Sequence, residues 1–347
     1  GLAFISEEQA QSMESVSVHL NDVLLNITGD STARVAIWNR RQQARVNQHV
    51  AIIRANPDQL DPYWLMYWLY SPEVKQHLLM LASSGASRAA LTKGMLEQLE
   101  LPDFSVRQQQ SISAPLRALD DKIAANQTSI SKIDEILRAL WQKELSLSNI
   151  DVPLSSLASF INGKAFTKGA SGTGRVVVRI AEMNSGIGSR TVYNDIDAAP
   201  DNVVDPGELL FSWSGTLMTK RWPYDQAIVN QHIFKVVPNG QLDLWALRQA
   251  IDAQLEYFQM IAAGKATTMG HIKRGDLDQE VEVPAQMSEE TNQLGNSLWR
   301  LATSLEIQNL QLARTRDELL PLLMSGRITV GEAEEVANVA GTAAWES

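Results

Sequence analysis

The sequence contains two copies of one module, and this internal repeat constrains the fold more than any other feature. The tetrapeptide Val-Asn-Gln-His at 46–49 recurs at 229–232. The same order continues downstream, where 93–102 is matched by 274–284. Solenoid repeats are far shorter, roughly 20–50 residues. The 347-residue chain is therefore predicted to hold a duplicated domain and a duplicated connector.

The two connectors show the clearest periodicity. After Pro102, apolar residues follow in steps of three and four, the heptad pattern of a coiled-coil helix. The same steps follow Pro284 at a constant offset, so that Ile112 matches Leu294. The apolar positions are Ile112, Leu116, Leu119, Ile123, Ile130, Ile133, Leu137 and Leu140, and then Leu294, Leu298, Leu301, Leu305, Leu312, Leu319 and Leu322. We expect helices of about 40 residues, roughly 60 Å long, with a kink or a late start at Pro115.

Each apolar seam is interrupted by one polar residue, Asn126 in the first and Gln308 in the second. Equal lengths and a duplication predict antiparallel pairing, with both amides near the midpoint and about one layer apart. A displaced register would leave each amide against Leu or Ile, at roughly 1–3 kcal/mol. The pair is therefore expected to fix the register. The alternative is that both amides face solvent or a partner helix.

The remaining blocks are typical of mixed α/β domains. Strand-like segments rich in β-branched residues and bounded by Gly, Pro or Asn lie at 23–27, 46–53, 176–180, 209–213 and 228–237. Asp61-Pro62 predicts a capped helix start, and Pro72 starts a second helix. The predicted fold class is α+β: two similar mixed α/β domains separated by two long helices that form an antiparallel coiled coil.

These patterns predict five segments. They are a first domain at 1–104, a first helix at 105–148, a second domain at 149–285, a second helix at 286–326 and a C-terminal tail at 327–347. The second copy places 153–208 ahead of its strand at Leu209, whereas only 1–22 precede Val23. We therefore expect the first domain to be N-terminally truncated, which agrees with a start at Gly1 rather than Met. It should lack the opening strands that the second copy builds from about 153 to 192.

The charge balance excludes one class of function. There are 30 Lys plus Arg against 40 Asp plus Glu, a net charge of −10, so the chain is not a histone-like protein that coats DNA by charge alone. No apolar run approaches the roughly 20 residues of a membrane helix, and no signal peptide is evident. The absence of cysteine excludes disulfides and thiolate sites and fits a reducing cytosol, so a cytoplasmic location is expected.

The sequence shows no convincing catalytic centre. Asp61-Pro62-Tyr63-Trp64 looks like the Asp-Pro-Pro-Tyr motif of amino-methyltransferases, but the preceding strand and a Gly-rich cofactor loop are missing, so a helix cap is favoured. The Gly-rich run 169–174 lacks the ending of a phosphate loop and is interpreted as a surface loop, with phosphate contact as the alternative. The five histidines have no metal-ligand spacing. We therefore expect no metal and no cofactor on this chain.

The two Asn-Gln-His triplets are the sharpest polar signal. They are expected inside apolar strands, where an unsatisfied polar group costs roughly 1–3 kcal/mol. The favoured interpretation is a structural hydrogen-bond network. Its members are Asn47, Gln48, His49, Asn230, Gln231 and His232. In the alternative, His49 and His232 or their neighbours reach a ligand.

Basic residues gather at matching points of the two copies, before each triplet and in the later loop. Such clusters are often only solvated surface, but duplicated basicity on an acidic chain suggests two faces that contact phosphates. The predicted DNA-contacting residues are Arg34, Arg40, Arg41, Arg45, Arg88, Lys93, Lys164, Lys168, Lys220, Arg221, Lys265, Thr267, Lys273 and Arg274.

Several of these segments resemble the specificity subunit of type I restriction–modification enzymes. The resemblance rests on 46–54, on 91–96 leading to 99–102, and on Leu119-Asp120-Asp121-Lys122-Ile123 with Asn126. In addition, 160–166 resembles the opening of that family's target-recognition domains, and 316–326 resembles its C-terminal end. The resemblance covers nearly the whole chain, with the truncated first domain as a departure.

The resemblance implies a non-catalytic DNA-binding subunit with two target-recognition domains. Each domain would read half of a bipartite target, held by two antiparallel conserved-region helices. The implied partners are double-stranded DNA, methyltransferase (modification) subunits and a restriction (translocase–nuclease) subunit, with no membrane. S-adenosylmethionine, ATP and Mg would be carried by the partner subunits. The alternative is a protein-interaction scaffold or a degenerate specificity subunit without DNA binding; missing motifs speak against a stand-alone DNA enzyme.

Overall fold

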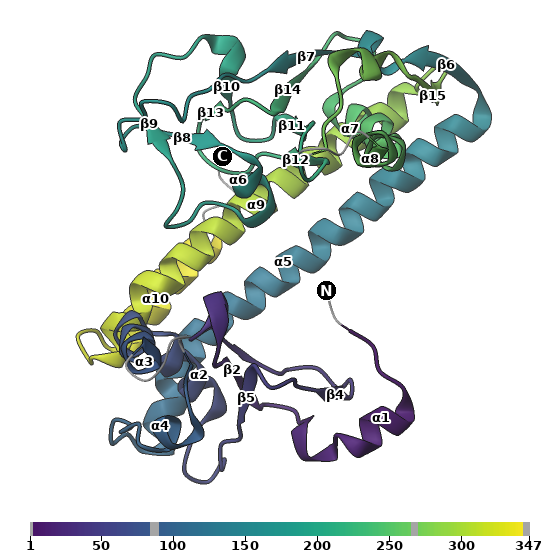
Figure 1. The fold of residues 1–347 in the computed structure, drawn as a ribbon. Coiled ribbons are helices and arrows are strands. Elements are labelled where there is room, and N and C mark those ends of the chain that lie inside the picture. The colour runs from purple at the N-terminus through teal and green to yellow at the C-terminus, as the bar shows by residue number, and fades with distance from the viewer. Residues whose placement is uncertain (1–2, 84–89, 265–269, 343–347) are drawn as a thin grey trace. The chain divides into compact units, whose positions relative to one another are not determined.

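The computed structural model describes residues 3–83, 90–264 and 270–342 (Figure 1). The chain divides into two compact units. Unit 1 comprises Gly1–Ile123 and Gln311–Ser347, and unit 2 comprises Ala124–Leu310. Each unit therefore contains part of both long helices, α5 (Val106–Leu147) and α9 (Glu289–Met324).

The two long helices run antiparallel, which confirms this part of the predicted fold (Figure 1). Asp120 meets Arg316 in unit 1, and Asn126 meets Gln308 in unit 2, so the residue numbers of the two helices run in opposite directions. Pro115 lies inside α5, and the helix does not start late.

The heptad pattern holds only in part in the first half of α9, where Leu298 and Leu305 pack against the core of unit 2. Leu294 and Leu301 are 46% and 42% exposed. The buried face there is instead formed by Gly295, Trp299 and Ala302. A Cβ built on Gly295 would collide with the Trp245 ring, so glycine at this position lets the helix approach the tryptophan. This half of α9 therefore turns its small and aromatic residues toward the domain of unit 2.

Unit 1 is built around a three-stranded antiparallel sheet of order β3-β2-β5 and a two-stranded sheet β1-β4. Its elements besides the long helices are α1 (Glu7–Ser12), η1 (Glu14–Val16), β1 (Ser17–Val18), β2 (Val23–Asn26), η2 (Gly29–Ser31), β3 (Val35–Ile37), β4 (Ala44–Arg45), β5 (Val50–Ile53), α2 (Pro62–Tyr70), α3 (Pro72–Ser83), α4 (Lys93–Glu97) and α10 (Val330–Thr342). Asp61 caps α2 by accepting from Trp64 N at 2.7 Å, and Trp64 is fully buried in the core.

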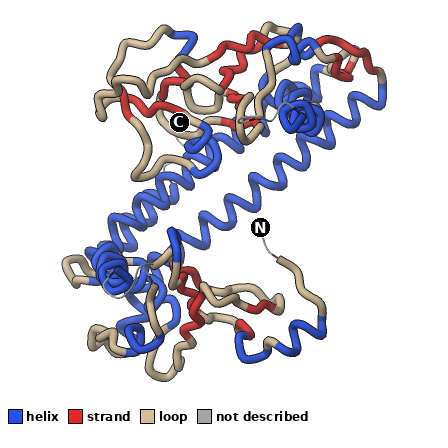
Figure 2. The backbone as a smooth tube through the Cα atoms, in the orientation of Figure 1, coloured by secondary structure: helices blue, strands red, loops and turns tan. Residues whose placement is uncertain are grey.

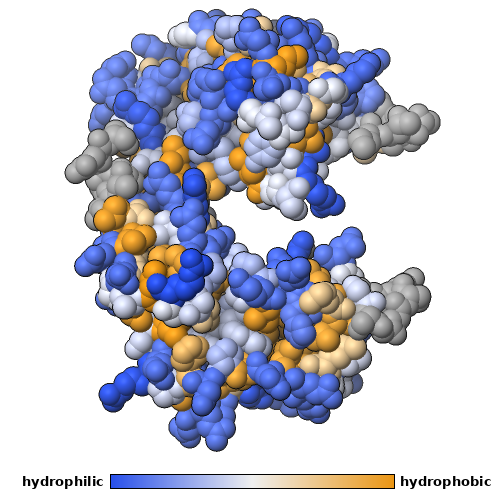
Figure 3. All heavy atoms as spheres, turned by 90° about the vertical axis from the view of Figure 1, so that its left-hand side faces the viewer, coloured by the Kyte–Doolittle hydropathy of each residue, from blue (hydrophilic) through white to orange (hydrophobic). Residues whose placement is uncertain are grey.

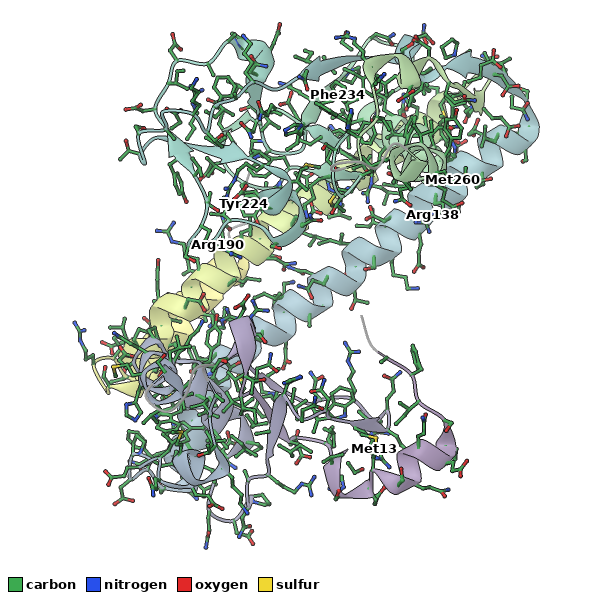
Figure 4. The ribbon with its side chains drawn as sticks, in the orientation of Figure 1. Met13, Arg138, Arg190, Tyr224, Phe234 and Met260 are labelled. Carbon is green, nitrogen blue, oxygen red and sulfur yellow. The ribbon has the colours of Figure 1, made fainter. Side chains whose placement is uncertain are left out.

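Unit 2 contains a four-stranded antiparallel sheet of order β12-β11-β14-β7, a sheet of order β10-β13-β8-β9 and the pair β15-β6. Its elements are β6 (Asn149–Pro153), η3 (Leu154–Ser156), β7 (Ala158–Asn162), β8 (Arg175–Val178), α6 (Ile180–Ser185), β9 (Tyr193–Asn194), η4 (Pro200–Asn202), β10 (Val203–Val204), β11 (Leu209–Ser212), β12 (Met218–Arg221), β13 (Ala227–Val229), β14 (Ile233–Pro238), α7 (Leu244–Ala253), α8 (Leu255–Gly264), η5 (Arg274–Asp278) and β15 (Glu280–Pro284). Phe234, labelled in Figure 4, lies in the core of this unit and packs edge-on against Phe160 at 5.9 Å.

The duplication is preserved in the strand registers. Figure 2 shows strands, drawn in red, in both units. Val23 pairs with Ile53 in unit 1, and Leu209 pairs with Val236 at the matching position of unit 2. The α+β class with two β-containing domains is therefore confirmed. One detail differs from the prediction. β5 begins at Val50 and β14 at Ile233, so the triplets lie in turns before the strands and not inside them.

The distribution of apolar residues was compared on the surface and along the helices. Figure 3 shows that hydrophilic residues cover most of one face, with hydrophobic residues in smaller groups between them. Among the helices that the structure describes, none has the length and apolarity needed to cross a bilayer.

Candidate nucleic-acid interface

Each unit builds the same arrangement of backbone at the end of its first repeated strand. In unit 1 the turn that contains the triplet is hydrogen-bonded to the residue after this strand: Ile27 N donates to His49 O at 2.9 Å. In unit 2, Trp213 N donates to His232 O at 3.0 Å. A turn that forms the same bond in both copies has been duplicated together with the strands.

A later segment closes on the same strand end in both units. Leu91 N donates to Ile27 O at 2.9 Å, and Ile272 N donates to Trp213 O at 3.0 Å. We call the result the strand-end cluster. It comprises residues 27–28, 47–49 and 90–91 in unit 1, and 213–214, 230–232 and 271–272 in unit 2. Residues 84–89, which precede Ala90 in the sequence, and 265–269, which precede Gly270, are outside the described structure.

The triplet of unit 1 is exposed and held by local bonds. Asn47 Oδ1 accepts from His49 N at 3.0 Å, and His49 Nδ1 lies 2.6 Å from Thr28 Oγ1. Gln48 is exposed and makes only a long contact, 3.4 Å, to His49 Nε2. The Asn and His side chains therefore belong to the turn itself, whereas Gln48 points into solvent.

The triplet of unit 2 is more deeply set. Asn230 is 7% exposed, and its Oδ1 accepts from Phe166 N at 3.1 Å. His232 adopts a left-handed backbone with φ of 81°, and its ring packs 5.0 Å from the Trp213 ring. Gln231 is exposed. In both units the Asn and His side chains contact neighbouring groups of the cluster, whereas the Gln side chain is exposed.

Most of the predicted DNA-contacting cations are on the surface. The exposed ones are Arg34, Arg40, Arg41, Lys93, Lys164, Lys168, Lys273 and Arg274, and Lys220 is half-buried. Arg88, Lys265 and Thr267 lie outside the described residues. Arg40 and Arg41 line a pocket of about 420 Å³ together with His19. Arg274 lines a groove of about 810 Å³ beside β7.

Arg221 is not available to DNA in this fold, which corrects the prediction for that residue. Its side chain is 1% exposed, and Nε and Nη2 donate to Glu306 at 2.8 and 3.1 Å. The guanidinium also lies 4.7 Å from the Trp299 ring centroid. Alternation along β12 points Arg221 at α9, where the carboxylate compensates its buried charge. Arg221 therefore attaches the sheet to the helix.

Arg45 is also largely committed to internal contacts. Its side chain is 10% exposed, it donates through Nε to Ala10 O at 3.1 Å, and it pairs with Glu14 at 2.6 Å. Because Glu14 neutralises this cation, Arg45 is a weaker phosphate ligand than Arg40 or Arg41 beside it. The sequence could not show this, since Glu14 belongs to a distant segment, η1.

A buried layer of amides joins the two long helices. Asn126 Nδ2 donates to Gln308 Oε1 at 2.7 Å, and the two residues are 3% and 1% exposed. Asn126 Nδ2 also lies 2.9 Å from Asn309 Oδ1. The two amides are in direct contact rather than one layer apart. Asn309 was missed because it lies one position beyond the seam.

A second set of buried polar contacts attaches α2 to the helices in unit 1. Tyr67 donates to Asp120 Oδ2 at 2.6 Å, and Arg316 donates to Asp120 Oδ1 at 2.6 Å. Burial and the Asp120 carboxylate raise the pKa of Tyr67 well above its usual value, so Tyr67 stays a neutral donor. Asp120 and Arg316 lie in two of the segments that carry the family resemblance, but no sequence signal indicated that they pair or that Tyr67 joins them.

Over residues 3–83, 90–264 and 270–342, no three His, Asp or Glu side chains gather as metal ligands would. The arrangement offers exposed cations, amides and turn backbones, which are groups suited to contacting phosphates and base edges.

No protein-family model and no curated protein matches the sequence. Solved structures do match. The S subunit of a type I restriction–modification system from M. genitalium is 15% identical, over 92% of this chain and 83% of that chain, with a TM-score of 0.44. The HsdS subunit from Thermoanaerobacter tengcongensis is 16% identical, over 93% and 81%, with a TM-score of 0.32. A structure concerned with complex assembly and conformational transition of the type I R-M system is 17% identical, over 94% and 82%, with a TM-score of 0.33.

Proposed function

We propose that this chain is the non-catalytic DNA-specificity subunit of a type I restriction–modification complex. It reads a bipartite target in double-stranded DNA and directs the methyltransferase and translocase–nuclease subunits to it. The observation that carries the proposal is the duplicated strand-end cluster. One polypeptide that builds the same loop geometry twice is suited to a target with two halves, and the linked sequence motifs support the same conclusion.

In this proposal, residues 1–104 and 149–285 are the target-recognition domains. The helices 105–148 and 286–326 are the conserved regions on which methyltransferase subunits dock, and 327–347 is a tail. S-adenosylmethionine, ATP and Mg belong to the partner subunits, and the complex acts in the cytoplasm.

The exposed cations beside the clusters supply the phosphate contacts. A net charge of −10 means that these contacts are local and that the chain as a whole does not attract DNA. Lys93 and Arg274 occupy matching positions, at the starts of α4 and η5, so both units offer a cation just after the later loop. Such contacts fix orientation on the duplex, while base edges carry the sequence information.

The test uses the complex reconstituted with methyltransferase subunits and a mixed-sequence DNA duplex. Changing Lys265, Lys273 and Arg274 together to Gln should weaken binding and flatten its salt dependence, by about 0.9 in slope for each lost phosphate contact. Lys75→Gln with Arg327→Gln, two exposed cations outside the clusters and outside the long helices, is the control for a loss of charge alone. Unchanged affinity and slope would show that this loop does not touch DNA.

Mapping methylated sites in cells with and without the chain tests the function itself. The expected result is methylation of one bipartite sequence that depends on the chain. A complex that assembles but neither binds duplex DNA nor alters methylation would instead identify a scaffold.

A further inference from the structure

The Asn-Gln-His turn separates residues that build it from one that does not. Asn47 and His49 bond within the turn of unit 1, and Asn230 bonds to Phe166 N in unit 2. Gln48 and Gln231, between them, are exposed. If the triplet served only to form the turn, any exposed polar residue could occupy its middle position. Both copies nevertheless have glutamine there.

The surroundings of Gln231 suit contact with DNA. Its backbone N donates to Lys164 O at 2.9 Å, and Lys164, an exposed lysine, also forms an isolated β-bridge with Asn230. The cation suits phosphate, which leaves the neutral amide beside it for a base edge. In unit 1, the turn bonds to Ile27, and Leu91 bonds to the same residue, two positions before Lys93. The turn of unit 2 is thus bonded directly to the backbone of a lysine, and in unit 1 a lysine follows the segment that completes the cluster.

The chemistry of the amide selects one base. A glutamine side chain has one donor and one acceptor side by side, and in the major groove adenine presents the matching N7 acceptor and N6 donor. Guanine instead suits Arg or Lys, and cytosine suits an acidic side chain. Because the same residue occupies the same turn in both units, it cannot distinguish the two halves of a target. It must contact a feature that both halves contain.

We propose that Gln48 and Gln231 are base-reading residues and that each reads an adenine, one in each half of the bipartite target. This assignment rests on the proposed function. The residues that differ between the two clusters, such as Ile27 against Trp213, then remain to distinguish one half from the other.

The experiment maps methylated sequences in cells that express the methyltransferase subunits with the full chain or its variants. Gln231→Ala should lower the preference for adenine at one position of one half-site by roughly 5- to 150-fold, the value of a bidentate base contact. Gln48→Ala should do the same in the other half-site. Gln231→Glu should move the preference toward cytosine, because a carboxylate accepts from cytosine N4.

Two matched controls are Gln59→Ala in unit 1 and Gln279→Ala in unit 2, both exposed glutamines outside the clusters. They should leave the sequence unchanged. Gln231→Asn keeps the amide on a shorter side chain and should retain part of the preference. Assembly with the methyltransferase subunits, measured by size-exclusion chromatography, confirms that each variant folds.

The outcomes separate the two proposals. An unchanged sequence in Gln48→Ala and Gln231→Ala, or half-sites that contain no adenine in the wild type, overturns the base-reading assignment. A uniform loss of methylation with the sequence unchanged and assembly intact also overturns it, because the contact would then be to the backbone. If the wild-type chain directs no methylation at all, the proposed function itself fails.

Discussion

The two repeated sheets differ in what lies beyond their last shared strand. In unit 2, β14 pairs with β7, and β15 pairs with β6. In unit 1, β5 is an edge strand, and 98–102 forms no strand. Burial follows the pairing, since Val283 is 4% exposed whereas its counterpart Leu101 is 42% exposed. The strand-end cluster nevertheless has the same backbone bonds in both units. Its geometry therefore depends on the shared strands and turn, and not on β6 and β7.

The starts of the two long helices differ in a similar way. α5 is capped from within its own sequence, because Ser105 N bonds to Gln108 Oε1 and Gln108 N lies 3.4 Å from Ser105 Oγ. α9 has the same serine cap, because Ser288 Oγ accepts from Thr291 N at 3.2 Å. The group that accepts from the Ser288 backbone differs, because it comes from the other helix: Glu144 accepts from Ser288 N at 3.2 Å and from Thr291 Oγ1 at 2.6 Å. The carboxylate of α5 thus takes the role at the start of α9 that Gln108 has at the start of α5.

The largest effect is expected where unit 2 has a contact that unit 1 lacks. A Cβ on Gly163 would collide with Asn230 O and Val229 O, both of them backbone atoms. Gly163→Ala should therefore destabilise unit 2 by about 3 kcal/mol or more. Amide hydrogen exchange should speed up in 158–238 and stay unchanged in 23–70. Gly188→Ala, which meets nothing within 4 Å, is the control; equal exchange in both variants would contradict the argument.

The next effect compares the two matching positions directly. Val283→Ala removes methyl groups from a buried strand and should cost about 2 kcal/mol in urea unfolding. Leu101→Ala removes a larger group from an exposed segment and should change stability by less than about 0.5 kcal/mol. Similar costs at the two positions would mean that 98–102 is covered in solution.

The amide layer should behave asymmetrically. Asn126→Leu removes the donor to the buried Gln308 Oε1 and should cost about 2 kcal/mol. Adding Gln308→Leu should recover most of this loss or exceed it, since an apolar pair suits the seam. The double variant should also loosen the register of the helices. Thermal unfolding of the single and double variants provides the measurement; an additive second loss would show that Asn309 needs both amides.

The smallest effect concerns acid. The hydroxyl of Thr291, followed by the groups of Ser288, holds the pKa of Glu144 below its ordinary value of 4.5. A lowered pKa in the folded state gives stability that is fully present above the unfolded pKa and is lost as pH falls through the folded one. Glu144→Gln should cost about 1 kcal/mol at pH 7. It should also show a shallower loss of stability below pH 4.5 than the wild type, measured by urea unfolding; parallel curves would refute the cap.

The overall plan of the fold could be predicted because an internal repeat and a heptad periodicity can be recognised from the order of the residues alone. The heptads of Leu116 and Leu137 predicted α5, and the duplication predicted its antiparallel partner. The exposure of Leu301 could not be predicted. Trp299 and Ala302 form a second apolar face on the same helix, and only packing against the domain of unit 2 determines that this face is buried and Leu301 is not.

The candidate site was predictable in type but not in detail. The cations and triplets were visible as repeated residues. The burial of Arg221 was not, since its partner Glu306 lies far along the chain, in α9. The triplets were expected inside strands because Val50 and Ile233 follow them without a break, and the left-handed backbone of His232 leaves no mark in the sequence.

The edge strand β5 also affects how molecules of this chain meet one another. No strand within the described residues pairs with its outer side, and open edges of this kind tend to join other chains. The net charge of −10 opposes such contacts, because like-charged molecules repel one another. Salt screens this repulsion, with a Debye length of about 8 Å near physiological ionic strength. The acidity that keeps the chain from coating DNA therefore also keeps its molecules apart, and concentrated stocks should be held at low salt.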